Sequence, residues 1–210
     1  ALRIGRYAER ELRSAGIDAR PVLVYGGRLG TYYVEFATAP RNTSVIYDRA
    51  NSAITEITLD QIDFDFLLDT RLIHLTGITP ALSTSCLKLS AEIIRRAKAA
   101  GVMVSFDVNY RSKLWSPKDA ADTLLPLIQG VDLLICSQRD AVQVFGCDPG
   151  VKSDADGASR VIGQLAEQTA AKNIVVSIGK DEVVGWDGAG YFHEHAKSVE
   201  IVDRIGAGSA

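Results

Sequence analysis

Leu72-Ile73-His74-Leu75 is a short apolar run typical of a strand, and from this point the chain follows an alternating pattern. Three more apolar runs come after it, and segments of helical character separate each run from the next. Strands that recur with helices between them indicate βαβ units around a buried parallel sheet. The predicted strands are 72–75, 102–106, 133–136 and 173–177, and the predicted helices are 84–100, 118–129, 138–145 and 156–170.

The chain before residue 72 has a different character. An amphipathic helix over residues 8–13 is expected to end near Gly16, because glycine suits the position just past a helix end. Short β-rich runs then follow one another with turns rather than helices between them, which predicts a small antiparallel sheet. These runs are 21–25, 31–37 and 43–48, and the first two should form a hairpin across the glycine-rich segment 26–30.

We therefore predict an α/β fold in which a layered sandwich with a mostly parallel sheet carries a small antiparallel insertion. Residues 21–53 form this insertion, called the flap below, and residues 1–20 and 54–210 form the α/β domain. Two closing β segments, 182–186 and 191–194, complete the predicted sheet.

Composition narrows the class of protein. The 210 residues are 47% hydrophobic and 23% charged, with a formal net charge of −3. This balance gives no electrostatic basis for binding nucleic acid or an anionic membrane, and no apolar stretch approaches the roughly 20 residues of a membrane span. The first six residues lack the apolar core of a signal peptide. Three cysteines without paired spacing indicate reduced thiols, so we expect a cytoplasmic protein; they are Cys86, Cys136 and Cys147.

Polar residues follow the 102–106 strand, where ligands of open parallel sheets bind. Asp107, Asn109 and Arg111 are spaced two apart, which places a carboxylate, an amide and a forked cation on one face of an extended segment. Such a set suits a polyhydroxylated anion, because an arginine can hold a carboxylate with two hydrogen bonds. The alternative is an Asp–Arg pair that ties loops together.

The flap carries a second set of candidates. Tyr32 and Tyr33 are adjacent, so their side chains lie on opposite faces of a strand, whereas Tyr47 and Arg49 share a face of the next strand. A tyrosine–arginine surface could contact a substrate. The tyrosines could equally be cross-strand packing pairs, and the flap could be a dimer interface.

The C-terminal segment Asp203-Arg204-Ile205-Gly206-Ala207-Gly208-Ser209-Ala210 follows a β-type run and should open a helix. Its small residues leave backbone N–H groups uncovered at that helix start. There the unpaired donors and the helix dipole together favour an anion.

These motifs resemble those of the PfkB, or ribokinase-like, carbohydrate kinases. The C-terminal segment is similar to that family's Asp-Thr/Arg-x-Gly-Ala-Gly-Asp signature, which implies that Gly206, Ala207 and Gly208 form the anion hole for the transferred phosphoryl group. The family's general base, an aspartate, falls at Ser209. A serine cannot act as a carboxylate base, so the chain as written is expected to lack that catalytic group.

The other motifs resemble those of 2-keto-3-deoxygluconate kinases in particular. The segment from Tyr47 to Ala53 is similar to their Tyr-x-Arg-x-x-Ser-Ala pattern, and the segment after the 102–106 strand is similar to their Asp-x-Asn-x-Arg. The resemblance implies a sugar-acid site. Its substrate-binding candidates are Tyr32, Tyr47, Arg49, Asn109 and Arg111, with Tyr32 chosen over Tyr33 by its spacing from Gly30.

The nucleotide motifs of the family are present in altered form. Ser137 and Asp140 occupy the place of its Asn-x-x-Glu, although Ser137 is also a good helix N-cap. Ser177 and Gly179 lie where the family has a glycine turn near ATP, and Asp203 begins the C-terminal signature. The resemblance implies ATP and Mg²⁺ as cofactors, with no protein side chain bound directly to the metal.

A complete family member of this kind has a three-layer α/β/α sandwich and phosphorylates 2-dehydro-3-deoxy-D-gluconate to its 6-phosphate with ATP. By that comparison the α/β domain handles nucleotide and phosphate and is incomplete at both ends, while the flap forms the lid and joins a homo-oligomer. Two alternatives are another PfkB sugar kinase, of fructokinase or ribokinase type, and a non-catalytic paralogue that binds sugar acids.

Overall fold

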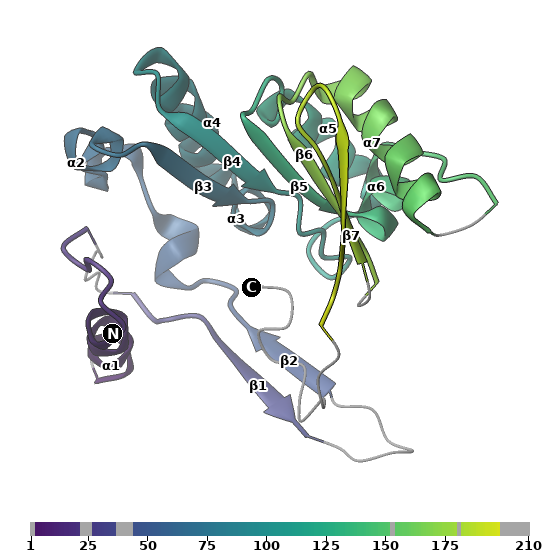
Figure 1. Ribbon diagram of the computed structural model, residues 1–210. Coiled ribbons are helices and arrows are strands. Elements are labelled where there is room, and N and C mark those ends of the chain that lie inside the picture. Colours follow the sequence, from purple (N-terminus) through teal and green to yellow (C-terminus); the bar gives the residue numbers. More distant parts are fainter. Residues whose placement is uncertain (1–2, 22–26, 37–43, 152–153, 180–181, 198–210) are drawn as a thin grey trace.

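The computed structural model describes residues 3–21, 27–36, 44–151, 154–179 and 182–197 (Figure 1). Within these residues the strands form two sheets, and most of the helices pack against the larger one. The helices are α1 (Arg3–Ser14), α2 (Phe64–Leu68), α3 (Ile78–Leu82), α4 (Thr84–Ala99), α5 (Pro117–Leu127), α6 (Gln138–Phe145) and α7 (Ala155–Thr169), with short 3-10 turns at Ala53–Glu56 and Leu59–Gln61.

The larger sheet is mixed and mostly parallel. Its strand order is β3-β4-β5-β6-β7-β8, in which the first three pairings are parallel and the last two antiparallel. The order follows the sequence, and helices connect the parallel strands. The strands are β3 (Leu72–Thr76), β4 (Met103–Asp107), β5 (Leu133–Ser137), β6 (Ile174–Ile178), β7 (Glu182–Trp186) and β8 (Tyr191–His195).

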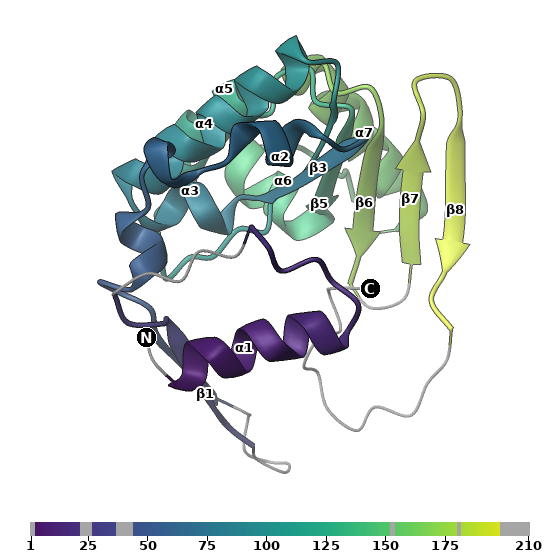
Figure 2. The same cartoon turned by 90° about the vertical axis from the view of Figure 1, so that its left-hand side faces the viewer.

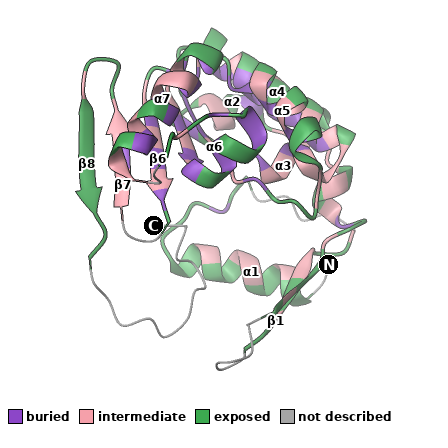
Figure 3. Ribbon diagram, turned by 90° about the vertical axis from the view of Figure 1, so that its right-hand side faces the viewer, coloured by how far each residue is buried: buried purple, intermediate pink, exposed green. Residues whose placement is uncertain are grey.

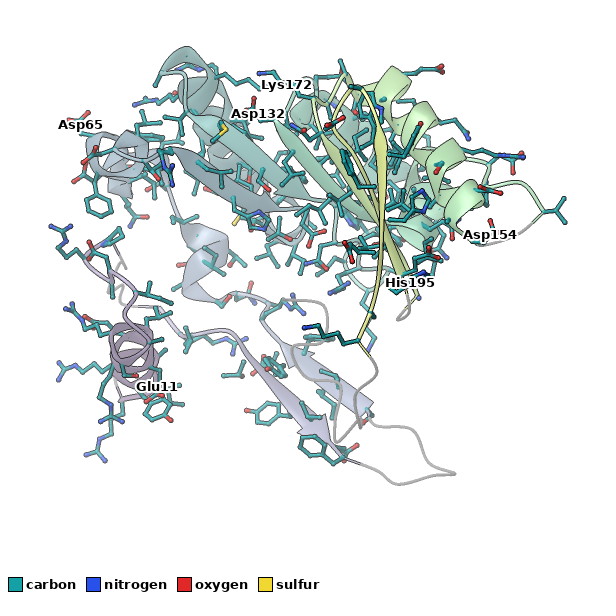
Figure 4. All side chains as sticks on the ribbon, viewed as in Figure 1. Glu11, Asp65, Asp132, Asp154, Lys172 and His195 are labelled. Carbon is teal, nitrogen blue, oxygen red and sulfur yellow. The ribbon has the colours of Figure 1, made fainter. Side chains whose placement is uncertain are left out.

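The core lies between this sheet and the helices α4 to α7, which cover one of its faces (Figures 2 and 3). Burial alternates along β5 and β6, as expected for strands with one face against the core. Fully buried side chains on the covered face include Phe106, Leu134 and Val176, and Leu124 reaches them from α5. Residues on the other face of the same strands, such as Ile135 and Val175, are half-buried.

The smaller sheet belongs to the flap. Here β1 (Thr31–Glu35) pairs antiparallel with β2 (Ser44–Asp48), and Tyr32 lies opposite Tyr47. The predicted strand at 21–25 lies almost wholly outside the described residues, so its hairpin stays a prediction. Helix α1 buries none of its residues and ends at Ser14, close to Gly16 as expected; the φ of +78° at Gly16 is one that only glycine adopts readily.

The predicted α/β architecture is confirmed: a mostly parallel sheet flanked by helices, with a small antiparallel sheet beside it. Helix α6 and strand β7 have the predicted bounds, and the other elements differ from the prediction at their ends. The short helices α2 and α3 are additional. The three cysteines are buried and unpaired. Among the described residues no helix is long and apolar enough to cross a membrane.

Candidate active site

The parallel strands β3 to β6 end at the edge of the sheet that faces the flap (Figure 1). At this edge the chain leaving β3 passes very close to the chain leaving β4. A Cβ on Gly77 would lie 2.2 Å from the carbonyl oxygen of Val108, and the Gly77 N–H donates to the carbonyl of Asp107 at 2.8 Å. Glycine is therefore required here, and it fixes the two strand ends against each other.

The segment after β4 adopts an unusual backbone conformation at Asn109, whose φ is +42°. A non-glycine residue in this region costs energy, so the surroundings must hold it in place. The Asn109 side chain donates to Oγ1 of Thr76, at the end of β3, over 3.1 Å. Next to it the exposed guanidinium of Arg111 contacts the carbonyl of Tyr110 at 3.2 Å. The strand ends thus present Asn109 and Arg111 on one short loop.

Asp107, the last residue of β4, sits in a charged neighbourhood. Burial raises the pKa of its carboxyl above the usual value, while the N–H of Asn109 and the charges of His74 and Arg111 act in the opposite direction. The nearby carboxylate of Asp140 adds to the upward shift. Asp107 and Arg111 influence each other electrostatically but form no ion pair within 4.0 Å, so Asp107 does not neutralise the arginine.

Asp140 is a buried carboxylate, and one of its two oxygens makes no hydrogen bond with the described residues. It is 5% exposed, and its Oδ2 accepts the backbone N–H of Tyr110 at 3.3 Å. Its Oδ1 has no hydrogen-bond partner among the described residues, although the Arg139 guanidinium lies 3.7 Å away. Asp140 therefore links the start of α6 to the loop that carries Arg111.

Ser137 is the N-cap of α6, because its Oγ accepts the backbone N–H of Asp140 at 3.0 Å. The capping role expected of this residue is confirmed, and its nucleotide role stays a prediction. Ser137 lies opposite Ser177 in the β5–β6 register, so the two hydroxyl residues are neighbours at the same sheet edge. Gly179 follows β6, is exposed, and has a φ of +57°.

In the flap, Tyr32 and Tyr47 face each other across the two strands, with ring centroids 6.3 Å apart. Tyr33 lies opposite Ile46 on the other face. The Arg49 guanidinium lies over the Tyr47 ring, with Cζ 4.2 Å from its centroid. The structure thus brings Tyr32, Tyr47 and Arg49 together, which fits both a substrate surface and a cross-strand packing pair.

The loop that follows Arg49 is tightly held. Ser52 is fully buried, and its hydroxyl donates to the Arg49 carbonyl at 2.7 Å. The Arg28 guanidinium makes a forked contact with Asp48, at 2.9 and 2.6 Å, and also donates to the carbonyl of Ala50. These bonds give the backbone around Arg49 a defined position.

The structure also shows a cation that the sequence did not single out. Lys113, two residues after Arg111, places its ammonium 5.5 Å from the Tyr47 ring centroid and 3.5 Å from the carbonyl oxygen of Val45. The sequence feature that could have drawn attention to Lys113 is the pair of basic residues after β4, Arg111 and Lys113. Nothing in that pair indicates contact with a tyrosine 66 positions earlier.

Five candidate residues lie outside the described residues: Asp203, Gly206, Ala207, Gly208 and Ser209. Within the part that the structure describes, no group of three or more histidine, cysteine or acidic side chains could hold a metal. Residues that could approach a bound nucleotide and its cation are Asp140, whose buried Oδ1 makes no hydrogen bond with the described residues, and the hydroxyls of Ser137 and Ser177.

Comparison with known proteins gives consistent matches along the chain. The sequence profile described as pfkB family carbohydrate kinase matches residues 3–209. A 2-dehydro-3-deoxygalactonokinase of Haloferax volcanii is 36% identical over 99% of this chain and 63% of its own length. A 2-dehydro-3-deoxygluconokinase of Thermoproteus tenax is 31% identical over 98% of this chain and 61% of its own length. The chain thus spans a little over 60% of these two relatives.

A comparison of the fold with solved structures also points to the carbohydrate kinases. The crystal structure of 2-dehydro-3-deoxygluconokinase from Thermotoga maritima aligns with a TM-score of 0.88 and 28% identity, covering 98% of this chain and 66% of that one. With the family profile matching nearly every residue and this fold in common, the chain belongs to the pfkB family of carbohydrate kinases and has their ribokinase-like α/β fold.

Proposed function

We propose that this protein uses ATP to phosphorylate 2-dehydro-3-deoxy-D-gluconate to its 6-phosphate in the cytoplasm. The observation that carries the proposal is that two arginines at and near the flap form no ion pair with any described residue. Among the described residues, neither Arg49 nor Arg111 has an acidic partner within 4.0 Å, and Arg49 lies against Tyr47. A neutral sugar would leave these arginines uncompensated, whereas a sugar acid supplies the carboxylate. Both relatives are named as kinases of 2-dehydro-3-deoxy sugar acids.

In this proposal the substrate lies between the flap and the loop after β4. Arg49 and Arg111 bind its carboxylate, Tyr32 and Tyr47 pack against its carbon chain, and Asn109 donates to a substrate oxygen. Holding the acid end in this way orients the distal hydroxyl toward the phosphate donor, and such positioning is a large part of catalysis of phosphoryl transfer.

The residues proposed for the phosphate end of the site are taken from the resemblance of their motifs to those of the PfkB kinases. The backbone N–H groups of Gly206, Ala207 and Gly208 would stabilise the charge of the transferring group. Ser137, Asp140, Ser177, Gly179 and Asp203 would line the nucleotide side. Mg²⁺, when bound with ATP, neutralises phosphate charge. The buried Oδ1 of Asp140, which makes no hydrogen bond with the described residues, would be available as a hydrogen-bond acceptor near that cation.

We further propose that residues 21–53 act as a lid and as the contact between subunits of a homo-oligomer. The face of the flap that points away from Tyr47 exposes Tyr33 by 59% and Ile46 by 55%. Light scattering of the full-length protein tests this proposal. A monomer at micromolar concentration, or a dimer that persists unchanged in a Tyr33→Glu/Ile46→Glu double variant, would contradict it.

A second candidate substrate is 2-dehydro-3-deoxy-D-galactonate, an epimer with the same carboxylate. The specific observation in its favour is the 36% identity to the Haloferax volcanii enzyme. Both acids require the same two arginines, so the arginines do not distinguish them.

The test is ATP-dependent phosphorylation by the full-length protein, with each acid and with fructose. Arg111→Gln should raise the KM for the acid about 10- to 100-fold, the factor for a lost charge-assisted hydrogen bond, with little change in the KM for ATP. Arg71→Gln is the matched control, because Arg71 is exposed just before β3, at the other end of that strand. Preference for fructose would favour the other sugar kinases, and acid binding without turnover would favour the non-catalytic paralogue.

A further inference from the structure

Lys113 connects the α/β domain to the flap. It belongs to a turn after β4 in which the Leu114 N–H donates to the Arg111 carbonyl at 2.9 Å. From this turn its ammonium reaches the carbonyl oxygen of Val45 and the ring of Tyr47, both on β2. A lysine on the domain therefore contacts the strand that carries the candidate substrate tyrosine.

Tyr47 consequently has two cations beside its ring. Arg49 comes from the flap itself, with Cζ 4.2 Å from the centroid, and Lys113 comes from the domain, with Nζ at 5.5 Å. Each is attracted by the ring, but the two cations repel each other. Neither has an acidic partner within 4.0 Å among the residues that the structure describes. Among the described residues, the two cations at this junction between flap and domain therefore have no anion paired with them.

We propose that Lys113 is a positioning residue that holds the flap over the sugar-acid site and thereby contributes to selection of an acid. Through Tyr47 it sets the distance between the flap and the loop that carries Arg111. A bound carboxylate relieves the repulsion between Lys113 and Arg49 and strengthens the contact between flap and domain. A neutral sugar leaves that repulsion in place. The selection step rests on the proposed function, whereas the contact between flap and domain does not.

The experiment uses full-length protein with Lys113→Ala, Lys113→Arg and the matched control Lys88→Ala. Lys88 is exposed on α4 and has no contact with the flap among the described residues. The first readout is backbone hydrogen exchange over β1 and β2 without substrate. We expect Lys113→Ala to speed exchange there about two- to fivefold, the factor that an exposed cation–π contact is worth, and Lys113→Arg to restore it. Exchange in Lys113→Ala equal to that in Lys88→Ala would overturn the inference.

The second readout is kinetic. Lys113→Ala should raise the KM for the sugar acid about two- to fivefold and leave the KM for ATP unchanged. Lys113→Arg should keep the KM for the acid close to that of the wild-type protein. An unchanged KM for the acid, or an equal rise for acid and ATP, would also overturn the inference. If the wild-type protein phosphorylates no sugar acid, the proposed function fails, and the exchange measurement still decides whether Lys113 holds the flap.

Discussion

Replacing Asp140 by alanine removes the acceptor of a buried backbone N–H. Tyr110 is 5% exposed, and its N–H donates to Asp140 Oδ2. An unsatisfied buried donor costs about 1–3 kcal/mol of unfolding free energy. Loss of a negative charge from the first turn of α6 adds about 0.3–1 kcal/mol. Removing the buried Oδ1, which has no hydrogen bond, offsets part of this. We expect Asp140→Ala to destabilise the full-length protein by about 1–3 kcal/mol.

The chain offers a matched control in α5. Asp119 follows the N-cap Ser116 by three residues, as Asp140 follows Ser137, but Asp119 is exposed. Asp119→Ala therefore measures the helix-start contribution without the buried hydrogen bond. Asp140→Asn keeps an oxygen that can accept the N–H and should cost less than about 1 kcal/mol.

The assay is urea unfolding followed by circular dichroism, with the KM for the sugar acid measured on the same variants. Because Tyr110 precedes Arg111, loss of its anchor should also raise that KM. A destabilisation by Asp140→Ala within about 0.5 kcal/mol of that by Asp119→Ala would refute the reasoning.

Three further predictions follow from the core, the titrating groups and the C-terminal motif. Leu124 is fully buried, so Leu124→Ala should lower the free energy of unfolding in urea by about 2–5 kcal/mol. Leu72 is partly exposed, so the control Leu72→Ala should lower it by less than about 1 kcal/mol. Equal losses in the two variants would contradict the assignment of the core. Burial raises the pKa of Asp107 in the folded protein above its value in the unfolded chain. The stabilising contribution of protonated Asp107 is therefore fully present below the unfolded-state pKa and is lost as the pH rises through the folded-state pKa. Asp107→Asn should therefore gain stability relative to wild type as the pH rises above about 4, the usual pKa of an aspartate, and a stability difference that does not change with pH would contradict this. Ser209→Asp should raise kcat about 10²- to 10⁴-fold if this position holds the general base, and an unchanged kcat would contradict the role.

The elements of the fold that could be predicted are those with a clear local pattern of apolar and polar residues. Apolar runs separated by helical segments identified β3 to β6 and the helices between them. The bounds of α6 were right because Ser137 is a cap and Gly146, with a φ of +67°, suits the position after the helix. The short helix α2 was missed, although Asp63 caps it, because five residues carry too little periodicity.

The candidate site was predicted less completely, because its geometry depends on contacts between distant segments. The rule that ligands bind beyond strand ends directed attention to the loop after β4, and the binding role of that loop stays a prediction. The hydrogen bond from Tyr110 to Asp140 joins residues 30 positions apart, and the contact of Lys113 with Tyr47 depends on where the flap lies. No local sequence pattern encodes either contact. The positive φ of Asn109 is likewise imposed by its surroundings, including the bond to Thr76.

The most direct test of the proposed sugar-acid site is ADP release by the full-length protein with 2-dehydro-3-deoxy-D-gluconate and with fructose as acceptors. We predict turnover with the acid whose KM rises about 10- to 100-fold in Arg111→Gln and is unchanged in Arg71→Gln, and no turnover with fructose above background. Faster turnover with fructose, or turnover with the acid that survives removal of both Arg49 and Arg111, would contradict the account.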